Sequence, residues 1–203
     1  MYRQPVRFSV AKRSSVACCI RMCAPLVVVS CALASTPAFS LRDSTGKTYT
    51  ESFLAGQKAT VFIFVATDCP NSNTYAPVLA RLYREYSPRG IAFFNVYSDP
   101  VESADSVRKH DADYSVPFPA LLDPHQVLAR MTGARSTPEI AILAPDGHEL
   151  YRGRVDDRFV DFGKTRFAPT ENDLQEALDA ILQNKPVAHP VTKVLGCAIP
   201  DLN

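Results

Sequence analysis

Cys69 stands where a thiol would be reactive. It follows the continuous apolar run 59–66, which predicts a strand buried on both faces. Pro70 suits the first turn of a helix, and apolar residues recur after it at helical spacing up to Tyr86. At a helix N-terminus, unpaired N–H groups and the positive end of the helix dipole favour a thiolate. We therefore expect Cys69 to be an acidic, reactive thiol, and the alternative is an inert buried cysteine.

Three other residues, Ser72, Thr137 and Pro138, are expected to belong to the same site as Cys69. Ser72, one turn into the predicted helix, is placed to donate a hydrogen bond to the Cys69 sulfur, and its alternative role is to cap the helix. Thr137 and Pro138 stand just before a predicted strand, where a proline is tolerated in trans or as a cis-proline.

The four histidines, His110 among them, lack the spacing of metal ligands. We expect them at the surface or in loops, and we expect no metal site.

The first 34 residues predict a secretory signal peptide. They carry five basic residues and no acidic one, and they end in a short apolar run with small residues at Ala32 and Ala34. This run is too short to span a membrane permanently, so we expect cleavage after Ala34 and a periplasmic or secreted protein. The alternative is a lipoprotein, with the membrane as a partner only through Cys31, because 28–31 loosely fits the segment that precedes an acylated cysteine.

Charge and cysteine count narrow the class of protein. The chain of 203 residues has 22 basic and 21 acidic side chains, and the predicted mature part keeps 17 basic and 21 acidic ones, a formal charge of −4. This balance does not favour nucleic acid or anionic lipid as a partner. Cleavage also leaves two of the six cysteines, Cys69 and Cys197. Two thiols in an oxidising compartment favour a disulfide, and the alternative is a free Cys197 in the tail.

The remaining pattern predicts strands alternating with helices in one domain. Pro145–Gly147 predicts a turn between two antiparallel strands. Asp156, Asp157 and Arg158 belong to an insertion, 155–170, and are expected to form a solvated or locally paired loop. The other expected elements are an edge strand or hairpin at 39–46, a buried strand at 91–97, a surface helix at 101–114, an extended piece at 117–123, a short helix at 125–131, strands at 139–143 and 149–154, a helix capped by 170–173, and a tail after 185 without periodicity.

The segment Phe64–Ser72 resembles the active-site segment of the thioredoxin-like superfamily. It is most similar to the redoxin group, which includes peroxiredoxin-like (AhpC/TSA-type) proteins and periplasmic TlpA/ResA-type thiol oxidoreductases. Residues 39–46 resemble the lead-in of redoxin domains, and Thr137–Pro138 matches the superfamily's cis-proline position beside the active-site cysteine. Residues 196–199 resemble an ending found in part of the peroxiredoxin-like branch.

This resemblance implies a thioredoxin-like α/β fold, with a central mixed sheet flanked by helices on both faces. The redoxin domain would comprise residues 35–184, between the signal peptide 1–34 and a tail 185–203 that carries Cys197. Two registers are open for the motif. In one, Ser72 replaces the second cysteine of Cys-x-x-Cys; in the other, Ala66 replaces the first cysteine of a Cys-x-x-Cys-Pro run.

The implied function is that of an exported thiol-disulfide oxidoreductase or redoxin. Cys69 would be the nucleophile, supported by Ser72, and Cys197 would be the candidate resolving thiol. The implied substrate-binding residues are Thr137, Pro138 and Thr67. No metal or organic cofactor is implied, and the expected partners are protein thiols or disulfides, or a small thiol or peroxide.

Departures from the family patterns weigh against two related functions. Peroxiredoxins place Thr or Ser three residues before the cysteine and an Arg across the site, where this chain has Ala66 and Pro138, so thiol peroxidase activity is less favoured. A Sco-type copper site needs a second cysteine where Asn73 stands. The alternative from another class is a redox-inactive thioredoxin-fold binding module, in which a Cys69–Cys197 disulfide only attaches the tail.

Overall fold

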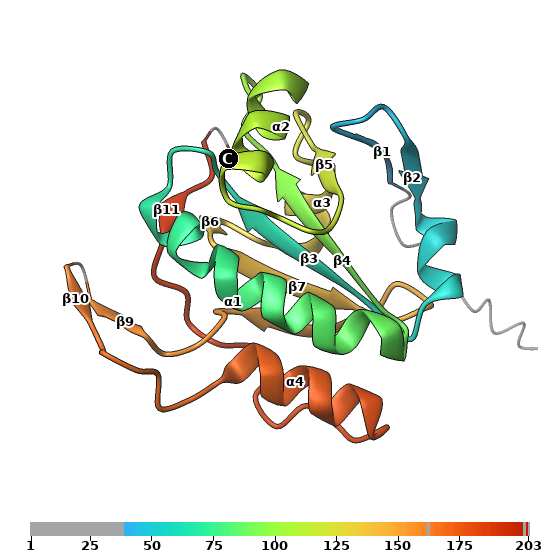
Figure 1. The fold of residues 1–203 in the computed structure, drawn as a ribbon. Helices are drawn as coiled ribbons and strands as arrows, with labels where there is room; N and C mark the ends of the chain where they lie inside the picture. The colour runs from blue at the N-terminus through green and yellow to red at the C-terminus, as the bar shows by residue number, and fades with distance from the viewer. Residues whose placement is uncertain (1–38, 162, 201, 203) are drawn as a thin grey trace, which may run out of the picture. The chain divides into compact units, whose positions relative to one another are not determined.

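A seven-stranded mixed sheet forms the centre of the fold (Figure 1). The computed structural model describes residues 39–161, 163–200 and 202, and the predicted signal peptide, its cleavage site and Cys31 lie outside them. In chain order the elements are β1 (Ser40–Asp43), β2 (Thr48–Thr50), η1 (Glu51–Gly56), β3 (Ala59–Val65), α1 (Pro70–Tyr86), η2 (Ser87–Arg89), β4 (Ile91–Tyr97), α2 (Ala104–Asp113), β5 (Ala120–Leu122), α3 (Val127–Thr132), β6 (Ser136–Thr137), β7 (Glu139–Leu143), β8 (Glu149–Gly153), β9 (Phe159–Asp161), β10 (Lys164–Thr165), α4 (Asp173–Leu182) and β11 (Cys197–Ala198). The strand order is β2-β1-β5-β4-β3-β7-β8. Strands β3, β4 and β5 run parallel and the other neighbours antiparallel.

The central strand β3 is apolar on both faces, so other elements must pack against both faces of the sheet. All seven of its residues are buried, and alternate side chains of a strand point to opposite faces. Val61, Ile63 and Val65 join a core packed against α1 and α4. Phe62 and Phe64 join a second core packed against α3, η1 and the β1–β2 hairpin. Figure 1 shows α1 and α4 in front of the sheet and α3 behind it. The predicted α/β architecture is confirmed.

Local signals place the ends of several elements correctly, with one exception. The helix predicted after Cys69 is α1, which begins at Pro70 and has Cys69 as its N-cap. The expected cap of the last helix by Thr170 is wrong, because α4 begins at Asp173 and its N-cap residue makes no side-chain cap bond. The Thr170 hydroxyl instead donates a hydrogen bond to the Asp157 carboxylate. A hydrogen bond to a charged acceptor is stronger than a neutral cap, so Thr170 stays with Asp157.

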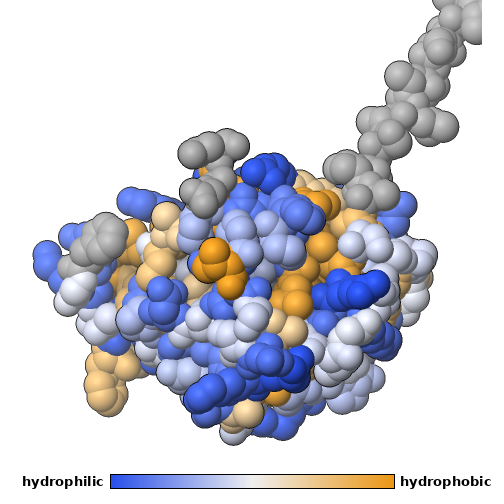
Figure 2. All heavy atoms as spheres, turned by 90° about the horizontal axis from the view of Figure 1, so that it is seen from above, coloured by the Kyte–Doolittle hydropathy of each residue, from blue (hydrophilic) through white to orange (hydrophobic). Residues whose placement is uncertain are grey.

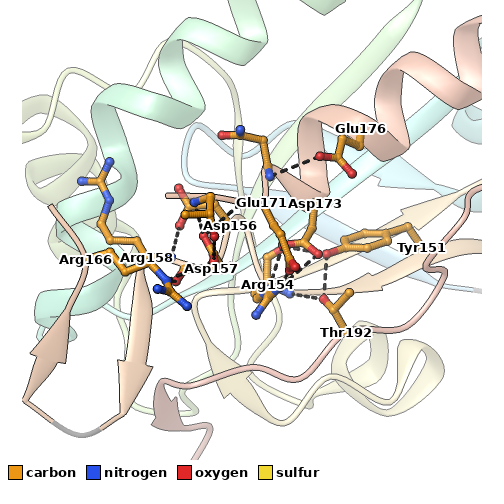
Figure 3. A network of polar contacts seen from close by, with 12 residues as sticks. Tyr151, Arg154, Asp156, Asp157, Arg158, Arg166, Glu171, Asp173, Glu176 and Thr192 are labelled. Atoms are coloured by element: carbon orange, nitrogen blue, oxygen red, sulfur yellow. Dashed lines mark hydrogen bonds and ion pairs between the residues drawn. The ribbon is translucent and has the colours of Figure 1, made fainter. Parts of the chain in front are cut away.

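The insertion 155–170 contains a hairpin, β9–β10, that extends away from the sheet (Figure 1). At its base Asp156 and Asp157 are only 4% and 5% exposed. The expected solvated loop is therefore wrong, and the paired alternative is observed. Asp157 accepts a hydrogen bond from the Thr170 amide at 2.6 Å and pairs with Arg166 at 3.1 Å (Figure 3). Asp156 accepts a hydrogen bond from Tyr75 of α1, which attaches the hairpin to the helix that follows Cys69.

The tail after α4 returns along the sheet. The Arg152 amide donates to the Pro190 carbonyl at 2.8 Å, and the Thr192 amide donates to the Arg152 carbonyl at 3.0 Å. The Thr192 hydroxyl lies 2.9 Å from the Tyr151 hydroxyl (Figure 3). Farther on, β11 pairs antiparallel with β6, and Ile199 is buried in the second core. The sequence did not predict this strand, because two residues carry no detectable alternation.

Candidate active site

Cys69 lies between the end of β3 and the start of α1. Its backbone is extended, with φ −85° and ψ 108°, and its carbonyl accepts a hydrogen bond from the Asn73 amide at 3.1 Å. This arrangement places the sulfur at the N-terminus of a 17-residue helix. Only 1% of Cys69 is exposed. The strand-to-helix position expected for the thiol is therefore observed, in a form closed to solvent.

Cys197 approaches Cys69 from the tail. The two Sγ atoms lie 2.8 Å apart although 128 residues separate them, and both cysteines are free thiols. The β6–β11 register sets this approach, because Cys197 pairs with Thr137. Gly196 permits the close packing, since a Cβ at that position would lie 2.3 Å from the Thr137 carbonyl oxygen. A disulfide has an S–S distance of about 2.05 Å, so a short approach of the thiols would close one.

The predicted residues Ser72 and Thr137 lie beside the Cys69 sulfur, and Pro138 follows Thr137. The Thr137–Pro138 peptide bond is cis, and the Thr137 carbonyl accepts a hydrogen bond from the Cys69 thiol at 3.2 Å. The hydroxyls of Ser72 and Thr137 are buried and have no hydrogen-bond partner among the described residues. Both are therefore free to donate to a Cys69 thiolate, and both lower the pKa of Cys69. The surroundings of Cys69 are thus polar at short range although they exclude solvent.

The two thiols have pKa values shifted in opposite directions. Burial raises the pKa of Cys69, but hydrogen bonds from Cys197, Ser72 and Thr137 outweigh this effect, so its pKa lies below the ordinary value. Burial, the hydrogen bond to Cys69 and the negative charge of Cys69 raise the pKa of Cys197 to about 11. When one thiol of the pair ionises, Cys69 is therefore the one that loses its proton. Because the thiolate is the nucleophilic form, Cys69 is the stronger nucleophile of the pair.

Thr67 is the one predicted site residue whose side chain is directed to other partners. Its hydroxyl donates to Glu102, and its carbonyl accepts from the Asn73 side-chain amide at 3.4 Å. The Asn73 side chain also contacts Nε2 of His110 at 2.7 Å. His110 is only 9% exposed, so the expected surface or loop role is wrong. Val107, three residues earlier on α2, is fully buried, and this spacing could have placed His110 on the same buried helix face.

The paired thiols are the chemistry that the site offers. In the part of the chain that the structure describes, no group of three His, Cys, Asp or Glu residues is arranged to hold a metal ion. No helix within the same residues is long and apolar enough to cross a membrane. Two sulfurs at this separation can exchange a disulfide with an external thiol or disulfide, a reaction that needs no further group.

Comparisons with known proteins find one family and several similar structures. The AhpC/TSA family matches residues 34–150. A hypothetical protein from Sinorhizobium meliloti 1021 is 28% identical, with a TM-score of 0.70, and the match covers 81% of this chain and 91% of that one. An uncharacterized conserved protein from Geobacillus kaustophilus is also 28% identical, with a TM-score of 0.70 and coverage of 81% and 88%. No curated protein matches the sequence.

A more distant structural match identifies the fold. A secreted Mycobacterium tuberculosis disulfide oxidoreductase, described as homologous to E. coli DsbE, is 17% identical to this chain. The match has a TM-score of 0.50 and covers 72% of this chain and 95% of that one. At this identity the likeness concerns the fold alone. The fold is thioredoxin-like, as the sequence resemblance implied.

Proposed function

Because the chain belongs to the AhpC/TSA family, we propose that it is an exported thiol-disulfide oxidoreductase with Cys69 as nucleophile and Cys197 as its disulfide partner. The observation that carries the proposal is the approach of two free thiols to 2.8 Å across 128 residues. In the proposed reaction, the dithiol passes two electrons and two protons to a substrate disulfide and itself becomes a disulfide. The reverse direction oxidises a substrate dithiol.

The surroundings of the pair support separate roles for its residues. The lowered pKa of Cys69 increases its thiolate fraction and makes Cys69 the better leaving group of the pair. Ser72 stabilises that charge, and the cis Thr137–Pro138 segment holds the chain against the sulfur. Protein thiols or disulfides are the proposed partners. The basic N-terminal segment supports export, which would keep the protein in an oxidising compartment.

One observation favours the second candidate, a redox-inactive binding module with a structural disulfide. The tail is attached by other contacts as well, because Ile199 is buried and its amide donates to the Arg135 carbonyl at 2.9 Å. A disulfide there would close a loop of 128 residues and would stabilise the fold by about 4–5 kcal/mol on the chain-entropy model.

Thiol peroxidase activity is a third candidate and is less favoured, because Ala66 and Pro138 stand where peroxiredoxins carry a hydroxyl and an Arg.

A redox titration separates the two candidates. The protein purified without residues 1–34 is equilibrated in glutathione or dithiothreitol buffers, and its free thiols are counted by mass tagging. An oxidoreductase should give a reduction potential between about −120 and −270 mV. A value below about −300 mV would favour the structural disulfide. Two free thiols under the most oxidising buffer would rule out the pairing, and Cys197→Ser is the control that should show no two-electron transition.

A further inference from the structure

The two sulfurs of the pair differ in their access to an external partner. Cys69 is 1% exposed and is closed in by Thr137 and by the β11 strand. Cys197 is exposed. An external thiolate must reach a sulfur along the axis of the bond that it breaks. In the observed arrangement Cys197 is exposed and Cys69 is buried, so an external thiolate has access to Cys197 and not to Cys69.

A groove of about 410 Å³ leads to the exposed sulfur. One wall comes from the β9–β10 hairpin and the other from the tail, which Figure 1 shows on the same side of the sheet. Cys197 lines this groove and Cys69 does not. The lining residues that matter here are Asn71, Phe159, Thr165, Leu195, Gly196 and Cys197.

The groove and the hairpin suit an extended polypeptide. Phe159 and Leu195 give the groove apolar surface, and the insertion also presents Val160, 48% exposed, and the fully exposed Phe167. Figure 2 shows pale orange spheres, which mark apolar residues, at the end of the molecule where the hairpin projects. Ala198 of β11 is exposed, and β6 is the one strand that pairs with β11 among the described residues, so the other edge of β11 is left for an added strand. Exposed apolar patches beside a reactive group mark interaction sites.

We propose that external thiols exchange with Cys197 rather than with Cys69, and that a cysteine-bearing extended polypeptide reaches Cys197 through this groove. The inference rests on the proposed function, because it needs the Cys69–Cys197 disulfide as the oxidised state. It assigns to Cys197 the contact with substrate, and to Cys69 the roles of leaving group and internal nucleophile.

The exchange balances without another oxidant. A substrate thiolate attacks Sγ of Cys197, the Cys69–Cys197 bond breaks, and its electron pair stays on Cys69 as a thiolate. The new bond joins the substrate sulfur to Cys197. A second thiolate of the same polypeptide then attacks the substrate sulfur and displaces Cys197, which takes up a proton. The substrate gains a disulfide, and the protein ends as the dithiol.

Mapping the first adduct tests the assignment of the exposed sulfur. The full chain, oxidised with glutathione disulfide, is mixed with 2-mercaptoethanol, quenched in acid after short intervals, treated with N-ethylmaleimide and digested for mass spectrometry. The expected first product carries mercaptoethanol on Cys197 and N-ethylmaleimide on Cys69. Mercaptoethanol on Cys69 overturns the inference and leaves the proposed function intact. Failure to form the intramolecular disulfide at all overturns both.

A groove variant tests the route. Thr165→Trp adds bulk to the groove lining, whereas Thr48→Trp adds the same bulk on β2, an exposed strand position remote from the groove. The probe is a hexapeptide with one cysteine flanked by leucine. We expect Thr165→Trp to slow exchange of the oxidised protein with this peptide by about tenfold, equivalent to about 1.4 kcal/mol, and to slow 2-mercaptoethanol far less. Equal rates for Thr165→Trp and Thr48→Trp with the peptide overturn the route.

Discussion

Cys197 lies directly opposite Thr137 in the β6–β11 pair, and the carbonyl of the same Thr137 accepts a hydrogen bond from Cys69. One residue therefore positions both sulfurs. It is also the residue expected to orient the backbone of a substrate. In this structure its backbone is paired with the chain's own tail.

The first prediction concerns the acidity of Cys69. Iodoacetamide alkylation of the reduced protein, followed peptide by peptide against pH, should show an inflection for Cys69 below the usual thiol value of about 8.5. Cys197 should titrate with a pKa near 11, because burial and its hydrogen bond to Cys69 both favour the protonated thiol. Above the Cys69 pKa its rate stays constant, and below that pKa its rate falls tenfold per pH unit. An inflection for Cys69 at or above 8.5 would contradict the assignment.

A matched pair of variants isolates the hydrogen bond between the thiols. Cys197→Ala removes the donor, whereas Cys197→Ser keeps a hydroxyl at the same place. Because a donor to the sulfur favours the thiolate, the pKa of Cys69 should be lower in Cys197→Ser than in Cys197→Ala. Equal inflections in the two variants would mean that the Cys197 side chain does not stabilise the thiolate.

A second prediction separates the two roles considered for Ser72. Ser72→Ala should lower the alkylation rate of Cys69 at pH 7 by about tenfold, because it removes one hydrogen bond to a charged acceptor, worth about 1.5 kcal/mol. Thr74→Ala is the control, since the Thr74 hydroxyl donates to the Pro70 carbonyl in the same helical turn and is exposed. If Ser72 only shaped the helix end, both variants would slow alkylation equally.

A third prediction follows from the contact at Gly196. In Gly196→Ala the new Cβ would meet the Thr137 carbonyl oxygen at 2.3 Å, so the tail must shift. We expect slower closure of the Cys69–Cys197 disulfide and a loss of about 1–3 kcal/mol in the free energy of unfolding. Gly56→Ala has no atom within 4 Å of its Cβ and is the control. Disulfide closure at the wild-type rate in Gly196→Ala would show that the tail adapts.

A fourth prediction concerns the N-terminus. Intact-mass analysis of the protein from its host should give a mature chain that begins at Ser35, because small residues at Ala32 and Ala34 precede the expected cleavage site. A chain that begins at a lipid-modified Cys31 would support the anchored alternative. A mass that includes all of residues 1–34 would defeat both.

A fifth prediction uses the buried carboxylate below the hairpin. Burial raises the pKa of Asp157, but hydrogen bonds from Thr170 and Glu171 and the charge of Arg166 bring it down to about 2. In the unfolded chain an aspartate titrates near 3.9. The stabilisation is therefore complete above about pH 4 and is lost as the pH falls towards 2.

Asp157→Asn should remove this dependence. Denaturant unfolding between pH 5 and 2 should show a shallower loss of stability in Asp157→Asn than in the wild type. Asp113→Asn, at an exposed position of α2, is the control. If wild type and Asp157→Asn lost stability in parallel over this range, Asp157 would carry no folding-linked proton.

Local signals in the sequence correctly predicted the part of the site formed by the end of β3 and the start of α1. The apolar run of β3 and the proline after Cys69 specify a buried strand and a helix start within a dozen residues, and both were predicted correctly. The cis bond before Pro138 followed from family resemblance together with a strand start. Each of these features depends on neighbours in the chain, so a pattern of residue types is enough to find it.

The rest of the site depends on contacts between distant segments. The two-residue strand at Cys197 exists because β6 offers it a partner, and nothing in its own residues predicts a strand. Asp156 and His110 are buried because Tyr75 and Asn73 bond to them from α1. A charged or polar residue in a loop or on a polar helix is expected to be exposed until its distant partner is known. The pairing of Cys69 with Cys197 in a disulfide stays a prediction.

The two cysteines are added to the growing chain at different times, because 128 residues separate them. A chain is made from its N-terminus at about 5–20 residues per second, so Cys197 is added about 6–26 s after Cys69. During that interval the residues of β3 and of the start of α1 have already been added, while Cys197, whose hydrogen bond lowers the pKa of Cys69, has not. The nascent protein thus carries a thiol that lacks its cysteine partner until its last segment arrives.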